Sequence, residues 1–289
     1  MPHPSTFSIV AYDPRLQAWG VAVASKFPAV GAVVPWVRAG YGAVATQSYA
    51  NTSFGPHGLE LMGSGLSATD TLERLLADDE GRAQRQVGLV DASGEPATYT
   101  GEACHAWAGG MTGQNYCVQG NILAGQAVVE AMAAGFEGAP GDLPARLLAA
   151  LLAGDRAGGD RRGRQSAAIY VARVAGGYGG LNDRWIDYRV DDNPDPVPRL
   201  QELFELHELY FGESEPAARL PIEGEVRQHL GEILAAHGYL PPEQADRQEA
   251  FTTALNEFIG NENFEERADA SAGWIDEPVY AFLLKKFAA

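Results

Sequence analysis

The chain has 289 residues, of which 46% are hydrophobic and 20% charged, a composition typical of a globular protein with one large core or a domain plus an appendage. Its 21 basic and 38 acidic residues give a formal net charge of −17, which disfavours a broad nucleic-acid-binding or anionic-membrane-binding surface. Two cysteines, Cys104 and Cys117, exclude a disulfide-dense scaffold and a Cys-rich zinc module.

The N-terminal sequence MPHPSTFSIVA has neither a basic segment nor a long apolar one, so we expect no signal peptide. No uninterrupted apolar run reaches the roughly 18 residues that a membrane-spanning helix needs. The sequence therefore predicts a cytoplasmic protein with no membrane partner.

Charge and glycine divide the chain into two parts. From Asp195 to the C-terminus there are 19 acidic and 7 basic residues, whereas 28 of the 34 glycines lie before residue 195. The segment DDNPDPVP at 191–198 is an acidic, proline-rich break between them. We therefore expect a domain at 1–195 and a second domain at 196–289.

Short strands separated by turns open the first domain. Alternating or continuous apolar residues predict strands at 6–12, 19–25, 31–37, 42–49, 85–90, 97–100, 116–123, 167–174 and 185–190. Helical spacing predicts helices at 58–62, 68–77, 126–136 and 142–153, with Ser67 as the N-cap of the second. Because the helices come in groups instead of alternating singly with strands, an α+β fold, arranged as a four-layer αββα sandwich, fits better than a doubly wound parallel sheet.

The second domain reads as a small all-α module. Apolar stripes predict helices at 199–211, 226–237, 248–259 and 278–287.

Lysine is rare in this chain. Only Lys26, Lys285 and Lys286 occur, so Lys26 is the single lysine of the first domain. Genomic base composition would explain the preference for arginine, but a retained lysine is also what a site that needs a primary amine would show.

Thr6 opens the first predicted strand, and Lys26 ends the second, where it could approach the start of the first. A hydroxyl in this position, with a nearby ammonium, suits an N-terminal nucleophile whose freed α-amine acts as the base. Ser8 lies two residues on and shares the face of the strand with Thr6, which makes it the alternative hydroxyl. An ordinary strand threonine remains the competing interpretation.

Amide side chains form a second candidate group. Gln119 and Asn121 lie inside the strand-like segment YCVQGNIL, where they suit an oxyanion or a substrate-amide contact. Gln47 is a further candidate substrate contact. A buried amide with satisfied hydrogen bonds is the alternative.

The third candidate group is the glycine-rich loop GGDRRGRQS. Arg161, Arg162 and Arg164, with Asp160 among them, could grip a carboxylate or phosphate. A solvated loop is the alternative, and the absence of a GK[ST] ending gives no support for nucleotide binding.

Metal and cofactor sites are not indicated. The six histidines are scattered without paired metal spacing, and no GxSxG motif of an α/β-hydrolase occurs. We expect no metal and no cofactor.

Several separate motifs, in this order, resemble a prokaryotic family of unknown function: TFSIVAYDP, GVAVASKFPAVGAVVPWVRAG, GAVATQSYAN, FGPHGLELM, QVGLVDASG, YCVQGNILAG and GGDRRGRQSAA. The resemblance covers about residues 6–195 and implies membership of the Ntn-hydrolase superfamily. It implies an αββα sandwich, with Thr6 at the position of the nucleophile and Lys26 near the position of the charged group beside it.

One feature departs from a processed enzyme of this kind. Five residues, MPHPS, precede Thr6, so an N-terminal nucleophile requires cleavage between Ser5 and Thr6 or a later start of translation.

The tail, about residues 200–289, resembles a peptidoglycan-binding domain through LGEILAAHGYLP, FTTALNEFIGNENFEERAD and WIDEPVYAFLLKKF. The resemblance implies peptidoglycan as a partner. The acidic charge of the tail is unfavourable for binding an anionic glycan, so dimerisation or another interface is an equal alternative.

Two functions follow as hypotheses. The first is hydrolysis of an amide or related C–N bond in a small molecule or peptide, with Thr6 as nucleophile, Lys26 tuning it, and Asn121 or Gln119 assisting the oxyanion. The second is a non-catalytic protein that binds a small acid through Arg161, Arg162 and Arg164, with the tail as a dimerisation or wall-binding module. We expect a homo-oligomer in either case.

Overall fold

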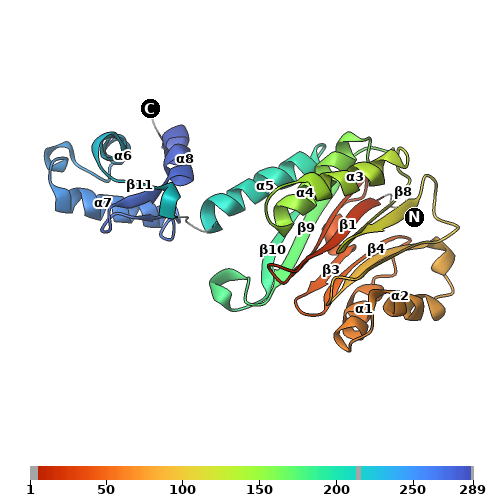
Figure 1. Ribbon diagram of the computed structural model, residues 1–289. Helices are drawn as coiled ribbons and strands as arrows, with labels where there is room; N and C mark the ends of the chain where they lie inside the picture. Colours follow the sequence, from red (N-terminus) through yellow and green to blue (C-terminus); the bar gives the residue numbers. More distant parts are fainter. Residues whose placement is uncertain (1–5, 213–215, 288–289) are drawn as a thin grey trace. The chain divides into compact units, whose positions relative to one another are not determined.

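The structure is a computed structural model that describes residues 6–212 and 216–287 (Figure 1). It divides into two compact units, the first ending at Glu202 and the second beginning at Leu203. The division falls within helix α5 (Pro196–Phe211), a few residues beyond the boundary at 195 that composition suggests.

A six-stranded sheet forms one half of the first unit. Its strand order is β10-β9-β2-β1-β8-β7, and all neighbours are antiparallel. Strands β1 and β2 are buried along their whole length, as expected of central strands that are covered on both faces. The strands are β1 (Thr6–Asp13), β2 (Ala18–Ser25), β7 (Gly109–Gly113), β8 (Tyr116–Asn121), β9 (Ser166–Arg173) and β10 (Arg184–Val190).

A four-stranded antiparallel sheet faces the first, in the order β3-β4-β5-β6. The strands expected at 85–90 and 97–100 are present as β5 and β6, which pair as an antiparallel hairpin. The strands are β3 (Pro35–Arg38), β4 (Gly42–Ser48), β5 (Arg85–Asp91) and β6 (Pro96–Thr100).

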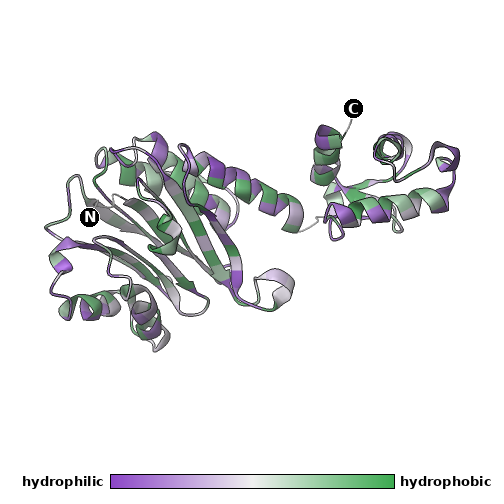
Figure 2. Ribbon diagram, turned by 180° about the vertical axis from the view of Figure 1, so that it is seen from behind, coloured by the Kyte–Doolittle hydropathy of each residue, from purple (hydrophilic) through white to green (hydrophobic). Residues whose placement is uncertain are grey.

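A pair of helices packs on the outer face of each sheet (Figure 1). Helices α1 (Phe54–Gly63) and α2 (Ala68–Ala77) cover the four-stranded sheet, and α3 (Ala127–Gly138) and α4 (Leu143–Arg156) cover the six-stranded one. The Ser67 hydroxyl accepts a hydrogen bond from the backbone N–H of Asp70, which confirms the expected N-cap of α2. In Figure 2 the strands of both sheets are largely hydrophobic in colour.

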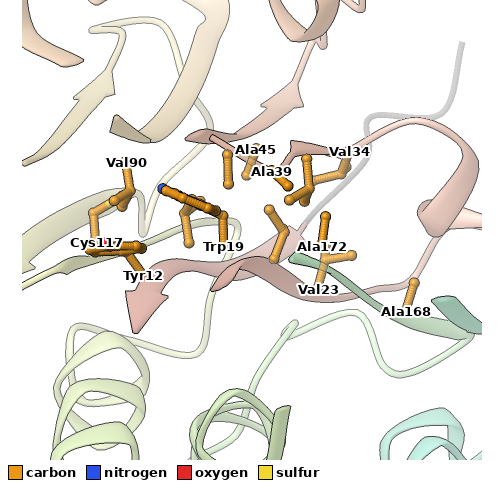
Figure 3. Close-up of a cluster of buried hydrophobic side chains, with 14 of the residues drawn as sticks. Tyr12, Trp19, Val23, Val34, Ala39, Ala45, Val90, Cys117, Ala168 and Ala172 are labelled. Atoms are coloured by element: carbon orange, nitrogen blue, oxygen red, sulfur yellow. The ribbon is translucent and has the colours of Figure 1, made fainter. Parts of the chain in front are cut away.

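The interior between the sheets is apolar at one end. Tyr12 and Trp19 stack with ring centroids 4.8 Å apart, and the Trp19 indole N–H donates to the Asp91 carbonyl at 2.9 Å (Figure 3). Because β2 carries Trp19 and β5 carries Asp91, this bond joins the two sheets. The same core cluster contains several small residues, among them Ala43, Ala45, Cys117, Ala168 and Ala172.

Two segments of the first unit differ from the expected strands. At 31–37 the chain forms a 3-10 turn (Val30–Ala32) before β3, and Ala29, which precedes the turn, takes a left-handed conformation with φ of 52°. Strand β7 was not expected, since its sequence GGMTG has no apolar alternation; it forms by pairing with β8.

The second unit is mainly helical, with its own core of buried side chains that includes Phe251, Phe258 and Phe264. Its helices are α6 (Gly224–Ala236), α7 (Gln248–Asn261) and α8 (Glu277–Phe287). It also holds a small antiparallel sheet of β11 (Arg219–Pro221), β12 (Ala268–Asp269) and β13 (Trp274–Asp276), so the unit is not purely α. Strands of two or three residues are too short to show a periodicity in sequence. Within residues 6–212 and 216–287, every helix is too short or too polar to cross a lipid bilayer.

Leu147 tests the packing of α4 on the six-stranded sheet. Its side chain is fully buried and packs against Gly20. A Cβ on Gly20 would lie only 2.6 Å from the Leu147 Cδ1. We expect Leu147→Ala to lower the free energy of unfolding by about 2–5 kcal/mol, because it leaves a cavity in the core. Leu181→Ala is the matched control, since Leu181 is 88% exposed, and should change stability little. Equal loss in both variants, measured by denaturant unfolding, would contradict this packing.

Candidate functional site

The predicted site residues of β1, β4 and β8 gather at one end of the two sheets. The register sets Thr6 opposite Ser25 on one side and opposite Asn121 on the other. Side chains that are opposite each other in neighbouring strands share a face of the sheet, so these three face the interior between the sheets. The strand register thus brings Thr6 and Asn121 together, as the nucleophile hypothesis requires.

Thr6 is the first residue of β1 and is 1% exposed. Its hydroxyl donates to the Ser25 Oγ at 3.3 Å, and its carbonyl accepts a long hydrogen bond, 3.5 Å, from the Gln47 amide. The expected cleavage between Ser5 and Thr6 lies outside the described residues and stays a prediction.

Ser8, Gln47 and Gln119 form a buried chain of hydrogen bonds between the sheets. The Ser8 hydroxyl donates to the Gln47 Oε1 at 2.7 Å and accepts from the Gln119 Nε2 at 2.7 Å. All three side chains are at most 1% exposed. In the structure the Ser8 hydroxyl therefore holds the side chains of Gln47 and Gln119, and its role as a direct substrate contact stays a prediction.

Gln86 is the centre of this network, and sequence reasoning missed it. Its Oε1 accepts from both Gln47 Nε2 and Asn121 Nδ2 at 2.9 Å, and its Nε2 donates to the Gly120 carbonyl at 2.8 Å. The one available signal is a glutamine at the start of the apolar segment RQVGLV. Gly88, two residues on, makes room for the Gln119 amide, which a Cβ at that position would overlap.

Lys26 directly follows Ser25, the partner of Thr6 in the strand register. Its side chain is exposed, and its Nζ donates to the Arg164 carbonyl at 3.3 Å. The backbone N–H of Lys26 donates to the Asp160 Oδ2 at 2.8 Å. The ammonium is therefore directed to the glycine-rich loop, one residue beyond the position that faces Thr6.

The glycine-rich loop is ordered by ion pairs. Asp160 is buried, accepts from the backbone N–H of Arg162 at 2.9 Å, and pairs with the Arg162 guanidinium at 3.0 Å. Gly158 and Gly163 allow the turn with φ of 111° and 115°, values that residues with a Cβ rarely adopt.

Arg164 is also held by carboxylates. It pairs with Asp155 at 2.7 Å and with Asp195 at 3.0 Å, and the hydrogen bond to Asp155 raises the pKa of the Arg164 guanidinium. Of the three arginines expected to grip an acidic ligand, Arg162 and Arg164 therefore already have acidic partners. Arg161 is exposed and forms no ion pair with any residue of the described chain.

No group of three or more His, Cys, Asp and Glu side chains suited to holding a metal ion occurs in the described part of the chain. Both cysteines are free thiols, and full burial raises the pKa of Cys117 to about 12, so its thiol stays protonated at neutral pH.

The second unit has a surface hollow of about 340 Å³ along α7, lined by both polar and apolar side chains. Its lining includes Tyr239, Arg247, Thr253 and Glu257.

Comparison with known proteins gives matches to both units. The model of the "Family of unknown function (DUF1028)" matches residues 6–200, and that of a "Putative peptidoglycan binding domain" matches residues 210–283. A crystal structure of a Silicibacter pomeroyi protein, titled with the same family, is similar with a TM-score of 0.65 and 28% identity, over 77% of this chain and 88% of that one. Comparison with curated proteins gives no match. The chain belongs to this family of unknown function.

A substitution of Gln86 tests the hydrogen-bond network between the two sheets. Gln86→Leu leaves the buried amides of Gln47 and Asn121 without their shared acceptor, so we expect a loss of about 1–3 kcal/mol in the free energy of unfolding. Gln84→Leu is the matched control, because Gln84 is exposed two residues away. Denaturant unfolding of both variants checks this, and an unchanged Gln86→Leu protein would contradict the network.

Proposed function

We propose that this member of a family of unknown function hydrolyses an amide or related C–N bond in a small molecule or peptide, with Thr6 as the nucleophile. The family's function is unknown, and the side chains around Thr6 and their order in the sheets support this reaction.

A gradient of polarity along the strands carries the proposal. The residues of β1 that face the other sheet run from the aliphatic hydroxyls of Thr6 and Ser8 to Val10 and the Tyr12 ring, and those of β8 run Asn121, Gln119, Cys117. Polar side chains thus collect only at the end where β1 begins. A reactive hydroxyl among oriented amides is the arrangement that acyl transfer needs.

The proposed reaction begins once the bond between Ser5 and Thr6 is broken. The Thr6 Oγ then attacks the substrate carbonyl carbon, and its proton passes to the freed α-amine of Thr6. The carbonyl oxygen becomes an oxyanion, which the Asn121 Nδ2 could stabilise, since Gln86 orients that amide. The α-ammonium returns the proton to the leaving amine, and water hydrolyses the remaining ester.

Lys26 has an electrostatic role in this proposal. Its ammonium donates to the Arg164 carbonyl in the glycine-rich loop, whereas the Thr6 hydroxyl donates to Ser25, so the proposed influence of Lys26 on Thr6 acts through space. Positive charge nearby favours the ionised hydroxyl and lowers the pKa of the α-amine.

The order of layers supports placing the first unit in the Ntn-hydrolase superfamily. Helices α1 and α2, the four-stranded sheet, the six-stranded sheet, and helices α3 and α4 follow one another as a four-layer αββα sandwich requires. This assignment is part of the proposal.

For the second unit we infer peptidoglycan as the ligand. The match to a peptidoglycan-binding domain over 210–283 favours it, and the hollow along α7 offers a surface for a glycan.

Thr6 variants test the nucleophile. A β-lactone probe should acylate the Thr6 Oγ by ring opening, which adds the whole mass of the probe to the chain. We expect labelling of the wild type and of Thr6→Ser, and a loss of at least about a thousandfold in labelling rate for Thr6→Ala. Thr112→Ala, an exposed threonine of β7, is the control and should label normally. Full labelling of Thr6→Ala would exclude Thr6 as the nucleophile.

Binding to purified sacculi tests the second unit. The full-length chain should sediment with sacculi, and Thr253→Trp should reduce this by about tenfold or more, because Thr253 lines the hollow. Asn256→Trp, on an exposed position of α7 outside the lining, should bind as the wild type does. Failure of the wild type to sediment, or equal binding by both variants, would count against a glycan at this hollow.

A further inference from the structure

A pocket of about 500 Å³ lies in the first unit between the start of β1, the end of β2, and two loops. Its apolar lining comes from Phe7, Ala24, Pro194, Pro196 and Val197. Its charged lining comes from residues 155–164, at and after the end of α4. Pockets that hold small organic ligands commonly have about 300–1,000 Å³ and combine apolar walls with a few polar groups.

The pocket opens on the opposite face of β1 from the Thr6 hydroxyl. Successive side chains of a strand point to opposite faces, and Phe7 lines the pocket whereas Ser8 bonds to the other sheet. The Phe7 ring lies 3.1 and 3.4 Å from the places where Cβ atoms on Gly159 and Gly154 would stand, which puts it on the side of α4. The charged and aromatic lining is therefore on the opposite face of β1 from the proposed nucleophile, although Ser25, which accepts from the Thr6 hydroxyl, also contributes to the pocket lining.

The carboxylates that line the pocket are already neutralised. Asp160 pairs with Arg162 and accepts from the Lys26 backbone, and Asp155 pairs with Arg164. A ligand would therefore meet few unpaired negative charges in the lining.

Arg156 and Arg161 differ from their neighbours. Both line the pocket, both are exposed, and neither guanidinium forms an ion pair or hydrogen bond with another residue in the described ranges. Because neither guanidinium has a carboxylate partner among the described residues, both are available to pair with an anion bound in the pocket. They stand out because the chain as a whole is strongly acidic.

We propose that this pocket binds a small organic acid. The carboxylate or phosphate-ester end pairs with Arg156 and Arg161, and the apolar part lies against Phe7, Val197 and the two prolines. The size and apolar lining favour such a ligand over a simple inorganic anion. The inference does not depend on catalysis by Thr6, because it uses other side chains on the other face of β1.

Calorimetric titration of the full-length chain tests it with a defined series. The probes are benzoate and octanoate as carboxylates, phenyl phosphate as a phosphate ester, inorganic phosphate as charge without an apolar part, and benzamide as benzoate without its charge. We expect at least one organic acid to bind, with inorganic phosphate and benzamide weaker by about tenfold or more. A preference between benzoate and phenyl phosphate identifies the anionic group.

Variants locate the binding. The double substitution Arg156→Ala, Arg161→Ala should raise the dissociation constant of the acid by about tenfold or more. Arg74→Ala should leave it unchanged, because Arg74 is an exposed arginine of α2 with no ion pair among the described residues. Thr6→Ala should bind the acid as the wild type does, which separates this inference from the proposed hydrolysis. The inference is overturned if no acid of the series binds, if benzamide binds as well as benzoate, or if the double variant keeps full affinity.

Discussion

The hydrogen bonds of buried amides between the two sheets are the constraint on which the rest of the first unit depends. Gln86 accepts from two amides of two different strands and donates to the backbone of β8, so a shift of either sheet would break several bonds at once. A buried amide without partners is costly, so the network fixes how the sheets face each other at this end. At the other end, Tyr12 and Trp19 fill the same space with apolar surface. The interior between the two sheets therefore has a polar end and an apolar end.

The polar end explains why Thr6 is a better candidate than other hydroxyls of the chain. The Ser8 hydroxyl is hydrogen-bonded to two glutamine amides. The Thr6 hydroxyl, at the start of the strand, has a long hydrogen bond to Ser25. The same strand serves two surfaces, because Phe7 lies between these two residues and faces α4. One short stretch of β1 thus borders both the proposed nucleophile and the pocket on the opposite side.

The sequence allowed much of this fold to be predicted, because alternation and caps are local signals. The strands at β1, β2, β4 and β8, the cap at Ser67 and the two halves of the chain follow from such signals. What it could not show depends on contacts between distant segments. Strand β7 forms only because β8 is beside it, and the short strands of the second unit depend on pairing with one another.

The same difference between local signals and distant contacts applies to the candidate site. Alternation places Thr6 and Ser8 on one face, but the role of Gln86 depends on which sheet faces which. The clustering of the loop arginines in the sequence indicates an anion site, but only the structure shows that Arg162 and Arg164 have carboxylate partners. Arg156 ends α4 two residues before the glycine-rich loop, and no motif in the sequence connects it with the loop arginines, although it lines the same pocket.

If Thr6 is an N-terminal nucleophile, its α-amine must become free to serve as a base, and the intact mass of the purified full-length chain shows whether it does. The account predicts a protein that has lost residues 1–5 and begins at Thr6, while the Thr6→Ala variant keeps them if the cleavage is the chain's own. A wild-type protein that retains residues 1–5 and still labels at Thr6 would contradict the α-amine as base, and one that neither loses them nor labels would contradict the nucleophile itself.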